Sequence, residues 1–86
     1  MLTVKIHKNA LKDLNSIPTD YRSGILDACN SMKSDPFSGD VKPLKGMPGI
    51  FRRRIGVYRI AFSVNFEDNE VLIIKVSKRD KFYDDL

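Results

Sequence analysis

Arginines are the residues of this chain best suited to chemistry, and five of the six lie in its second half. Three are consecutive, Arg52 to Arg54; Arg59 follows closely, and Arg79 lies further along. The guanidinium group is a planar fork of donors that matches phosphate oxygens two at a time and stays protonated at physiological pH. This concentration of arginine predicts binding of a phosphate-rich polyanion and stabilisation of charge that develops on a phosphate.

Charge is divided unevenly along the chain. The 86 residues carry 15 Lys or Arg and 11 Asp or Glu, a net charge of +4. Residues 1–40 hold five basic and five acidic side chains, whereas residues 41–81 hold ten basic and four acidic ones. The second half is therefore expected to form the polyanion-binding surface, and the alternative is a solvated sheet face that happens to be basic.

Length and composition bound the class of protein. Eighty-six residues allow one domain, residues 1–86, and 42% hydrophobic residues are ordinary for a globular fold. A single cysteine excludes an internal disulfide framework and favours a reducing compartment. No apolar run approaches the roughly 18 residues of a membrane span, and the charged N-terminal segment is unlike a signal peptide. We expect a cytoplasmic protein with no membrane association.

Few other residues are candidates for chemistry. No set of His, Cys, Asp or Glu has the spacing of metal ligands, and there is no glycine-rich phosphate loop, so we expect no metal and no cofactor. His7, the only histidine, is expected to be structural, although histidine is the side chain best suited to proton transfer near neutral pH. Cys29 is expected in the core, and Arg53 is expected to be a structural or rim residue.

The first half predicts the elements that must support the arginines. Residues 3–7 alternate and are rich in β-branched types, which is typical of a short strand. Apolar residues at helical spacing then predict one helix from Ala10 to Ile17 and a second from about Pro18 to just before Asp35. The short break between them predicts a helical hairpin.

The second half predicts a loop followed by three strands. Residues 35–49 contain three prolines and three glycines and are expected to be loop. Strands are expected at residues 50–55, 58–66 and 70–76, joined by turns at residues 56–57 and 67–69. The order β-α-α-β-β-β indicates an α+β domain whose helical hairpin packs on one face of a mostly antiparallel sheet.

Alternation along the strands predicts which side chains share a face. Arg59 is expected to face away from Tyr58 and Ile60. In the last strand, the row expected to face the helices is Leu72, Ile74 and Val76, and the opposite row includes Val71 and Ile73. Four arginines would then converge on the open face of the sheet: Arg52, Arg54, Arg59 and Arg79.

Nearly the whole chain resembles the RelE/ParE toxin superfamily. The resemblance is carried by the segments Lys42–Gly46, Arg52–Arg54, Ile55–Ile60 and Val76–Arg79, with Tyr83 four residues further on. Members are toxins of toxin–antitoxin pairs. The RelE branch cleaves mRNA, typically in the ribosomal A site, and the ParE branch poisons DNA gyrase.

The resemblance implies a metal-independent endoribonuclease, in which a ribose 2′-OH attacks the adjacent phosphate. It implies that Arg59 binds the phosphate and stabilises its transition state, and that Arg79 is a second cation near the leaving oxygen. Tyr83 would stack on a base or shuttle a proton. Arg52 stands where active relatives carry a lysine thought to serve as base, and Ile50 where they carry a second lysine. Arginine is a poor base but remains an electrostatic stabiliser and substrate clamp.

The resemblance also implies partners. The side chains expected to contact RNA are Lys42, Lys45, Arg54, Lys78 and Lys81. A RelB-like antitoxin is expected to form a heterodimer or heterotetramer with the chain and to lay an acidic or amphipathic helical segment over the cationic face. We expect it to displace a mobile tail, residues 81–86.

Three functions remain open from the sequence. The first is a mRNA interferase acting on the ribosome. The second is a ParE-like gyrase inhibitor, which the missing lysines favour. The third is a toxin relic that only binds antitoxin and co-represses its operon. Three of the candidate residues could have structural roles instead of catalytic ones. Arg59 could pair with Glu67 or Glu70, and Arg79 and Tyr83 could anchor the C-terminal segment.

Overall fold

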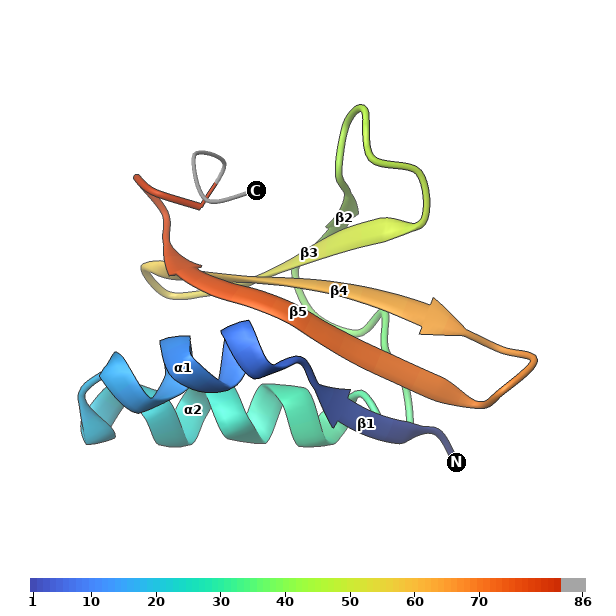
Figure 1. Cartoon of the computed structure of the whole chain (residues 1–86), viewed down its shortest axis with the longest axis horizontal. Helices are drawn as coiled ribbons and strands as arrows, with labels where there is room; N and C mark the ends of the chain where they lie inside the picture. The colour runs from blue at the N-terminus through green and yellow to red at the C-terminus, as the bar shows by residue number, and fades with distance from the viewer. Residues whose placement is uncertain (83–86) are drawn as a thin grey trace.

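The computed structural model describes residues 1–82 and shows two helices packed on one face of a five-stranded sheet (Figure 1). The elements in chain order are β1 (Thr3–Ile6), α1 (Lys8–Ser16), α2 (Thr19–Ser31), β2 (Val41–Pro43), β3 (Ile50–Ile55), β4 (Tyr58–Asn65) and β5 (Glu70–Lys78). The predicted α+β class and the helical hairpin are confirmed. Neither helix of the described chain is long and apolar enough to cross a membrane.

The strands lie in the order β1-β5-β4-β3-β2. β1 is parallel to β5, and the other three pairings are antiparallel. β4 is therefore the central strand, flanked by the hairpin partners β3 and β5. The tight turn between β3 and β4 begins at Gly56, whose φ of +56° is a conformation that glycine adopts without steric cost.

The segment predicted to be entirely loop contains a strand. β2 pairs antiparallel with β3 and places Lys42 across from Arg52. Proline cannot donate to a strand ladder, and for that reason it is confined to positions such as an edge strand, where Pro43 lies. The prediction for residues 35–49 was wrong at these three residues, because a proline-rich composition masks a short edge strand.

The main core lies between the helices and the sheet. Its helical side consists of Ala10, Leu14, Ile17, Ile25, Ala28, Cys29 and Met32, and its sheet side consists of Tyr58, Ile60, Phe62, Val71, Ile73 and Val76. His7 caps α1, because its Nδ1 accepts a hydrogen bond from the N–H of Asn9 at 3.1 Å. The structural roles predicted for His7 and Cys29 are therefore confirmed.

A β-bulge in β5 decides which of its side chains face the helices. Ala61 pairs with Lys75 whereas Phe62 pairs with Ile73, which leaves Ile74 without a direct partner in the ladder. The row that faces the helices is Val71, Ile73 and Val76. The predicted row of Leu72, Ile74 and Val76 was right for Val76 and wrong for Leu72 and Ile74, because strict alternation does not continue through a bulge.

A second, smaller apolar cluster lies on the sheet face opposite the helices, which we call the open face. Its buried members are Leu44, Ala61 and Phe82, with Ile50 and Ile74 packed against them. Phe82 is 0% exposed, so the chain that follows β5 is anchored on this face. The expectation of a mobile tail was wrong at Phe82, and residues 83–86 lie outside the described residues.

Candidate nucleic-acid interface

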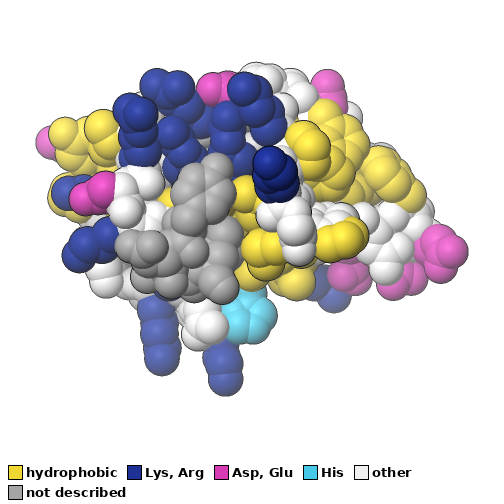
Figure 2. Space-filling model, turned by 90° about the horizontal axis from the view of Figure 1, so that it is seen from above, with side chains coloured by type: hydrophobic (Ala, Val, Ile, Leu, Met, Phe, Trp, Pro, Cys, Tyr) yellow, Lys and Arg dark blue, Asp and Glu magenta, His cyan; other side chains and the backbone are white. Residues whose placement is uncertain are grey.

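Strand pairing gathers basic side chains on the open face. Arg54 lies directly across from Arg59 in the β3–β4 hairpin. In the next row of the same face, Arg52 lies between Lys42 of β2 and Ala61 of β4. Residues paired across a ladder point to the same side of the sheet, so the four cations share one surface. We call this set the basic face, and Figure 2 shows Lys and Arg side chains gathered on this side of the molecule.

Arg59 is the most deeply buried cation of the basic face. It lies on the central strand and is only 7% exposed, whereas Arg54 is exposed. The proposed partner Glu70 instead binds Lys5 at 3.0 Å and lies across from Asn65 at the far end of β4. The pairing of Arg59 with Glu70 was therefore wrong. The sheet holds Arg59 in a fixed position beneath the surface of a positively charged face.

The three consecutive arginines of β3 all contact one segment of the preceding loop. Nη1 of Arg52 donates to the backbone carbonyl and to Oδ1 of Asp40, each at 3.3 Å. On the other side of the strand, Nη1 of Arg53 donates to the carbonyl of Ser38 at 2.8 Å. The backbone N–H of Arg54 donates to the carbonyl of Asp40 at 3.0 Å. Arg53 therefore has the structural role predicted for it, and the loop is fixed to the strand that carries Arg52.

The same loop requires a glycine. Gly39 has a φ of +83°, and a Cβ at this position would lie 2.5 Å from Cζ of Arg53. The backbone conformation therefore disfavours a side chain, and a Cβ would also require the guanidinium group of Arg53 to move. We call residues 38–40 the Asp40 loop. The contacts between this loop and the arginines were not predicted, and their only signal is the Ser-Gly-Asp sequence ahead of the arginines.

The remaining predicted contacts are more dispersed. Lys45 is exposed on the loop after β2. Arg79 is exposed just beyond the end of β5, where its N–H donates to the carbonyl of Val57 at 2.7 Å. Lys78 lies across from Tyr58 and therefore on the side of the sheet that faces the helices, away from the basic face. Tyr83 lies outside the described residues.

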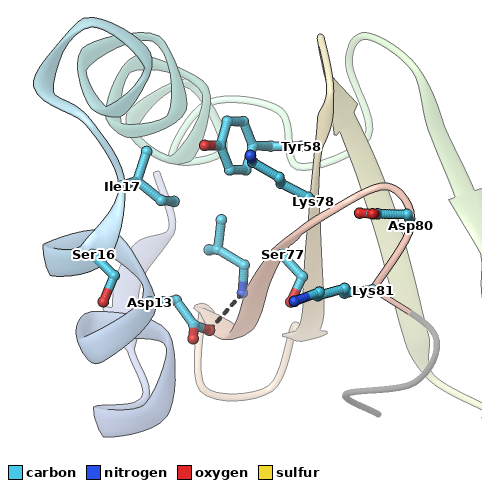
Figure 3. Close-up of a pocket in the computed structure, with 9 residues that line it drawn as sticks. Asp13, Ser16, Ile17, Tyr58, Ser77, Lys78, Asp80 and Lys81 are labelled. Atoms are coloured by element: carbon cyan, nitrogen blue, oxygen red, sulfur yellow. Dashed lines mark hydrogen bonds between the residues drawn. The ribbon is translucent and has the colours of Figure 1, made fainter.

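A cavity of about 480 Å³ lies between α1 and the end of β5 (Figure 3). Its lining consists of Asp13, Ser16, Ile17, Tyr58, Val76, Ser77, Lys78, Asp80 and Lys81. Lys78 and Lys81 thus line a hollow that mixes both signs of charge, and the arginines of the basic face are not among its lining residues. Of the predicted RNA contacts, only Lys42 and Arg54 are brought together with Arg52 and Arg59 by strand pairing.

Asp13 joins α1 to the outer edge of β5. Its Oδ1 accepts from Nζ of Lys75 and its Oδ2 from the N–H of Val76, both at 3.0 Å. β1 ends at Ile6, across from Ile73, so beyond that point β5 has no strand on its outer side. The carboxylate supplies the acceptor that a longer β1 would have supplied. This contact fixes the strand that runs next to Arg59.

Candidates for acid–base and metal chemistry are sparse around the basic face. Ile50 packs against the apolar cluster of the open face, and Arg52 is held by Asp40. Burial raises the pKa of the Cys29 thiol from 9.0 to about 11, although the nearby charge of Arg53 partly opposes this shift. Within residues 1–82, no three His, Cys, Asp or Glu side chains form a group that could hold a metal ion. The chemistry open to the basic face is electrostatic stabilisation of an anion.

The fold and the basic face together define a small α+β protein with a surface suited to an anionic partner. Residues 4–83 match the family model described as the ParE toxin of the type II toxin–antitoxin system parDE. The chain belongs to the RelE/ParE family of type II toxins. The match covers all the strands and both helices except for Thr3 at the start of β1.

Individual relatives agree with this assignment. The chain is 34% identical to a putative toxin RelE1 of Methanocaldococcus jannaschii, over 93% of this chain and 92% of that protein. The archaeal RelE–RelB complex from Pyrococcus horikoshii contains a similar chain, with 32% identity, a TM-score of 0.78, and coverage of 91% of this chain and 94% of the other. The toxin–antitoxin complex RelBE2 from Mycobacterium tuberculosis contains another, with 26% identity, a TM-score of 0.81, and coverage of 91% and 98%. The chain is thus a RelE-like toxin of a type II toxin–antitoxin system.

Proposed function

We propose that this toxin is a mRNA interferase that cleaves ribosome-bound mRNA without a metal ion and so inhibits translation and growth. The observation that carries the proposal is the direct opposition of Arg54 and Arg59, with Arg52 in the next row. Attack of a ribose 2′-OH on the adjacent phosphate builds negative charge on the phosphate oxygens. Fixed guanidinium groups stabilise such charge because they need no reorganisation when it forms. The reaction would take place in the cytoplasm, where ribosomes translate.

In this proposal the candidate residues have distinct roles. Arg59 stabilises the phosphate under attack, and Arg52 clamps it from the neighbouring row. Arg79, exposed beyond β5, approaches the leaving oxygen, and Tyr83 stacks on or orients a base. The backbone contacts would be Lys42, Lys45 and Arg54 on the open face, with Lys78 and Lys81 reached from the side of the cavity. Since Arg59 is only 7% exposed, RNA must displace the atoms that cover it.

The positions that carry lysines in active relatives hold Arg52 and Ile50. Because arginine stays protonated, Arg52 cannot accept the 2′ proton at physiological pH. Ile50 is packed in an apolar cluster and has no proton to exchange. The proposed catalysis therefore depends on charge stabilisation and on orientation of the RNA, most of which the ribosome would supply.

A RelB-like antitoxin is the proposed protein partner, as a heterodimer or heterotetramer. Similar chains are found in RelE–RelB complexes from Pyrococcus horikoshii and Methanococcus jannaschii. An acidic or amphipathic segment laid over the basic face would neutralise its charge and prevent access of RNA to Arg59.

The decisive experiment is induction of the toxin followed by mapping of the 5′ ends of cellular mRNA. We expect new 5′ ends within coding regions and an early stop of translation. Arg59→Ala should abolish both while the protein still folds and binds its antitoxin. Lys33→Ala, which removes a cation from the chain after α2, should leave cleavage unchanged. Undiminished cleavage in Arg59→Ala would contradict the site assignment.

The second candidate function is gyrase inhibition. It is favoured by the match to the ParE family model and by the absence of lysine at residues 50 and 52. A gyrase poison should produce DNA-damage signalling while translation continues, whereas the interferase stops translation first. A chain that binds antitoxin but arrests no growth would instead be a toxin relic.

A further inference from the structure

We propose that Asp40 is a positioning residue of the basic face, which holds Arg52 in the orientation that receives an RNA phosphate. The inference rests on the proposed function, since it concerns how the same surface binds RNA. Asp40 is the last acidic residue before a stretch of 26 residues without one, and it lies beside the arginines.

The contact engages one corner of the guanidinium group. Both hydrogen bonds between the two residues use Nη1 of Arg52, one to the backbone carbonyl and one to Oδ1 of Asp40. Within residues 1–82, Asp40 is the only residue that accepts hydrogen bonds from the side chain of Arg52. Nε and Nη2 therefore keep their donors for another partner. A guanidinium group carries five donors in a rigid fork, so fixing one corner fixes the direction of the others.

Asp40 is itself fixed by contacts that do not involve its carboxylate. Its carbonyl accepts from the N–H of Arg54 at 3.0 Å, and Arg53 donates to the carbonyl of Ser38, two residues earlier, at 2.8 Å. The backbone of Asp40 is therefore held beside β3, within reach of Arg52. The side chain of Arg52 is 12% exposed, which is low for an arginine on the surface of a sheet.

This arrangement favours binding because Arg52 is ordered before RNA arrives. Immobilising a long side chain costs conformational entropy, and a preformed contact moves that cost from binding to folding. A carboxylate that acted by charge alone would have the opposite effect, since it would repel phosphates and weaken binding. Removal of the Asp40 carboxylate should therefore weaken RNA binding if Asp40 orders Arg52, and strengthen it if Asp40 only repels phosphates.

The test measures binding of a single-stranded 2′-O-methyl oligoribonucleotide at low salt, because this probe lacks the 2′-OH that cleavage requires. Asp40→Ala should bind about three- to tenfold more weakly than the control Asp27→Ala, as expected for the loss of one pre-ordered side chain. Asp27 is exposed on α2, on the side of the sheet away from the basic face. Its variants change the net charge of the protein by the same amount as the Asp40 variants. Asp40→Asn, whose amide oxygen can still accept from Arg52, should bind within about twofold of Asp27→Asn.

A second comparison ties the effect to Arg52. In an Arg52→Ala background, Asp40→Ala should cause no further loss of affinity. Affinity of Asp40→Ala equal to or tighter than that of Asp27→Ala would overturn the inference, and so would an undiminished loss in the Arg52→Ala background. Thermal unfolding of each variant checks the fold, and Asp40→Asn provides the comparison if Asp40→Ala does not fold. RNA binding without coupling between Asp40 and Arg52 overturns only this inference, whereas absence of mRNA cleavage in cells overturns the proposed function.

Discussion

Arg54 and Arg59 occupy directly opposed positions in the β3–β4 hairpin and point to the same face of the sheet. Like charges at opposed positions of two strands lower the stability of a sheet. Repulsion between the two cations therefore opposes this arrangement, although Arg59 has other interactions within the protein. An anion bound between them would relieve that repulsion, which links the stability of the hairpin to occupancy of the basic face.

Neutralising Arg54 should stabilise the protein while weakening its function. Arg54→Gln removes the repulsion and keeps a long polar side chain, so we expect the free energy of unfolding to rise by roughly 0.2–1 kcal/mol. RNA binding should weaken at the same time, because one phosphate contact is lost. Urea unfolding and oligonucleotide binding measure the two effects. Arg54→Lys keeps the charge and should resemble the unchanged protein in both; a stability equal to that of Arg54→Gln would show that repulsion is not the cause.

Gly39 should tolerate substitution less well than Gly46, although both have positive φ values, of +83° and +77°. A Cβ at Gly39 meets the guanidinium group of Arg53 at 2.5 Å, whereas a Cβ at Gly46 meets nothing within 4 Å. Gly46→Ala should therefore cost only the backbone strain, about 1 kcal/mol, and Gly39→Ala should cost more because it also displaces Arg53. Equal losses of stability in denaturant unfolding would contradict the proposed clamp on the Asp40 loop.

Asp13→Asn should destabilise the end of β5. The change weakens the bond to Lys75, and the N–H of Val76 loses a charged acceptor in a partly buried place. Such losses cost about 1–3 kcal/mol. Faster hydrogen exchange at the Val76 amide and a lower unfolding midpoint in urea would show this loss of stability. The exposed Asp27→Asn serves as control, and indistinguishable behaviour of the two variants would mean that Asp13 does not hold the strand.

Cys29 should make stability depend on pH in alkaline solution. The folded protein raises the pKa of this thiol from 9.0 to about 11, so above pH 9 the unfolded chain releases a proton that the folded protein retains. Stability therefore falls with rising pH, by about 1 kcal/mol per pH unit between 9 and 11. Cys29→Ala should lack this component, and the difference between the two unfolding curves isolates it. Parallel curves over that range would contradict the burial of the thiol.

The regular elements were predictable because their patterns are local. Alternation and turn residues predicted β3 with its observed bounds and β4 to within one residue, and helical spacing predicted the hairpin of α1 and α2. The same alternation placed Arg52, Arg54 and Arg59 on one face, since none of them lies beyond an irregularity in β3 or the first part of β4. The side chains of β5 were misplaced because a bulge next to Ile74 depends on how two strands fit together.

The contacts between distant segments were not predictable. The spacing of Asp40 and Arg52 in the sequence does not predict that Asp40 accepts a hydrogen bond from Arg52. The two residues meet because β2 pairs with β3. The burial of Phe82 against Leu44 and Ala61 was likewise not predictable from its place near the end of the chain. The roles of Arg59, Arg79 and Tyr83 remain predictions from the resemblance. Strand pairing supports only the grouping of Arg59 with Arg52 and Arg54.

The short length of β1 has a consequence for how copies of this toxin meet. A strand edge with unmatched backbone groups is a template on which another chain can add a strand, and this is a common route to aggregation. Beyond Ile73 the outer edge of β5 would be such a template, but the carboxylate of Asp13 already occupies the N–H of Val76. The contact thereby leaves one fewer unmatched N–H at this edge on which a second copy of the toxin could add a strand.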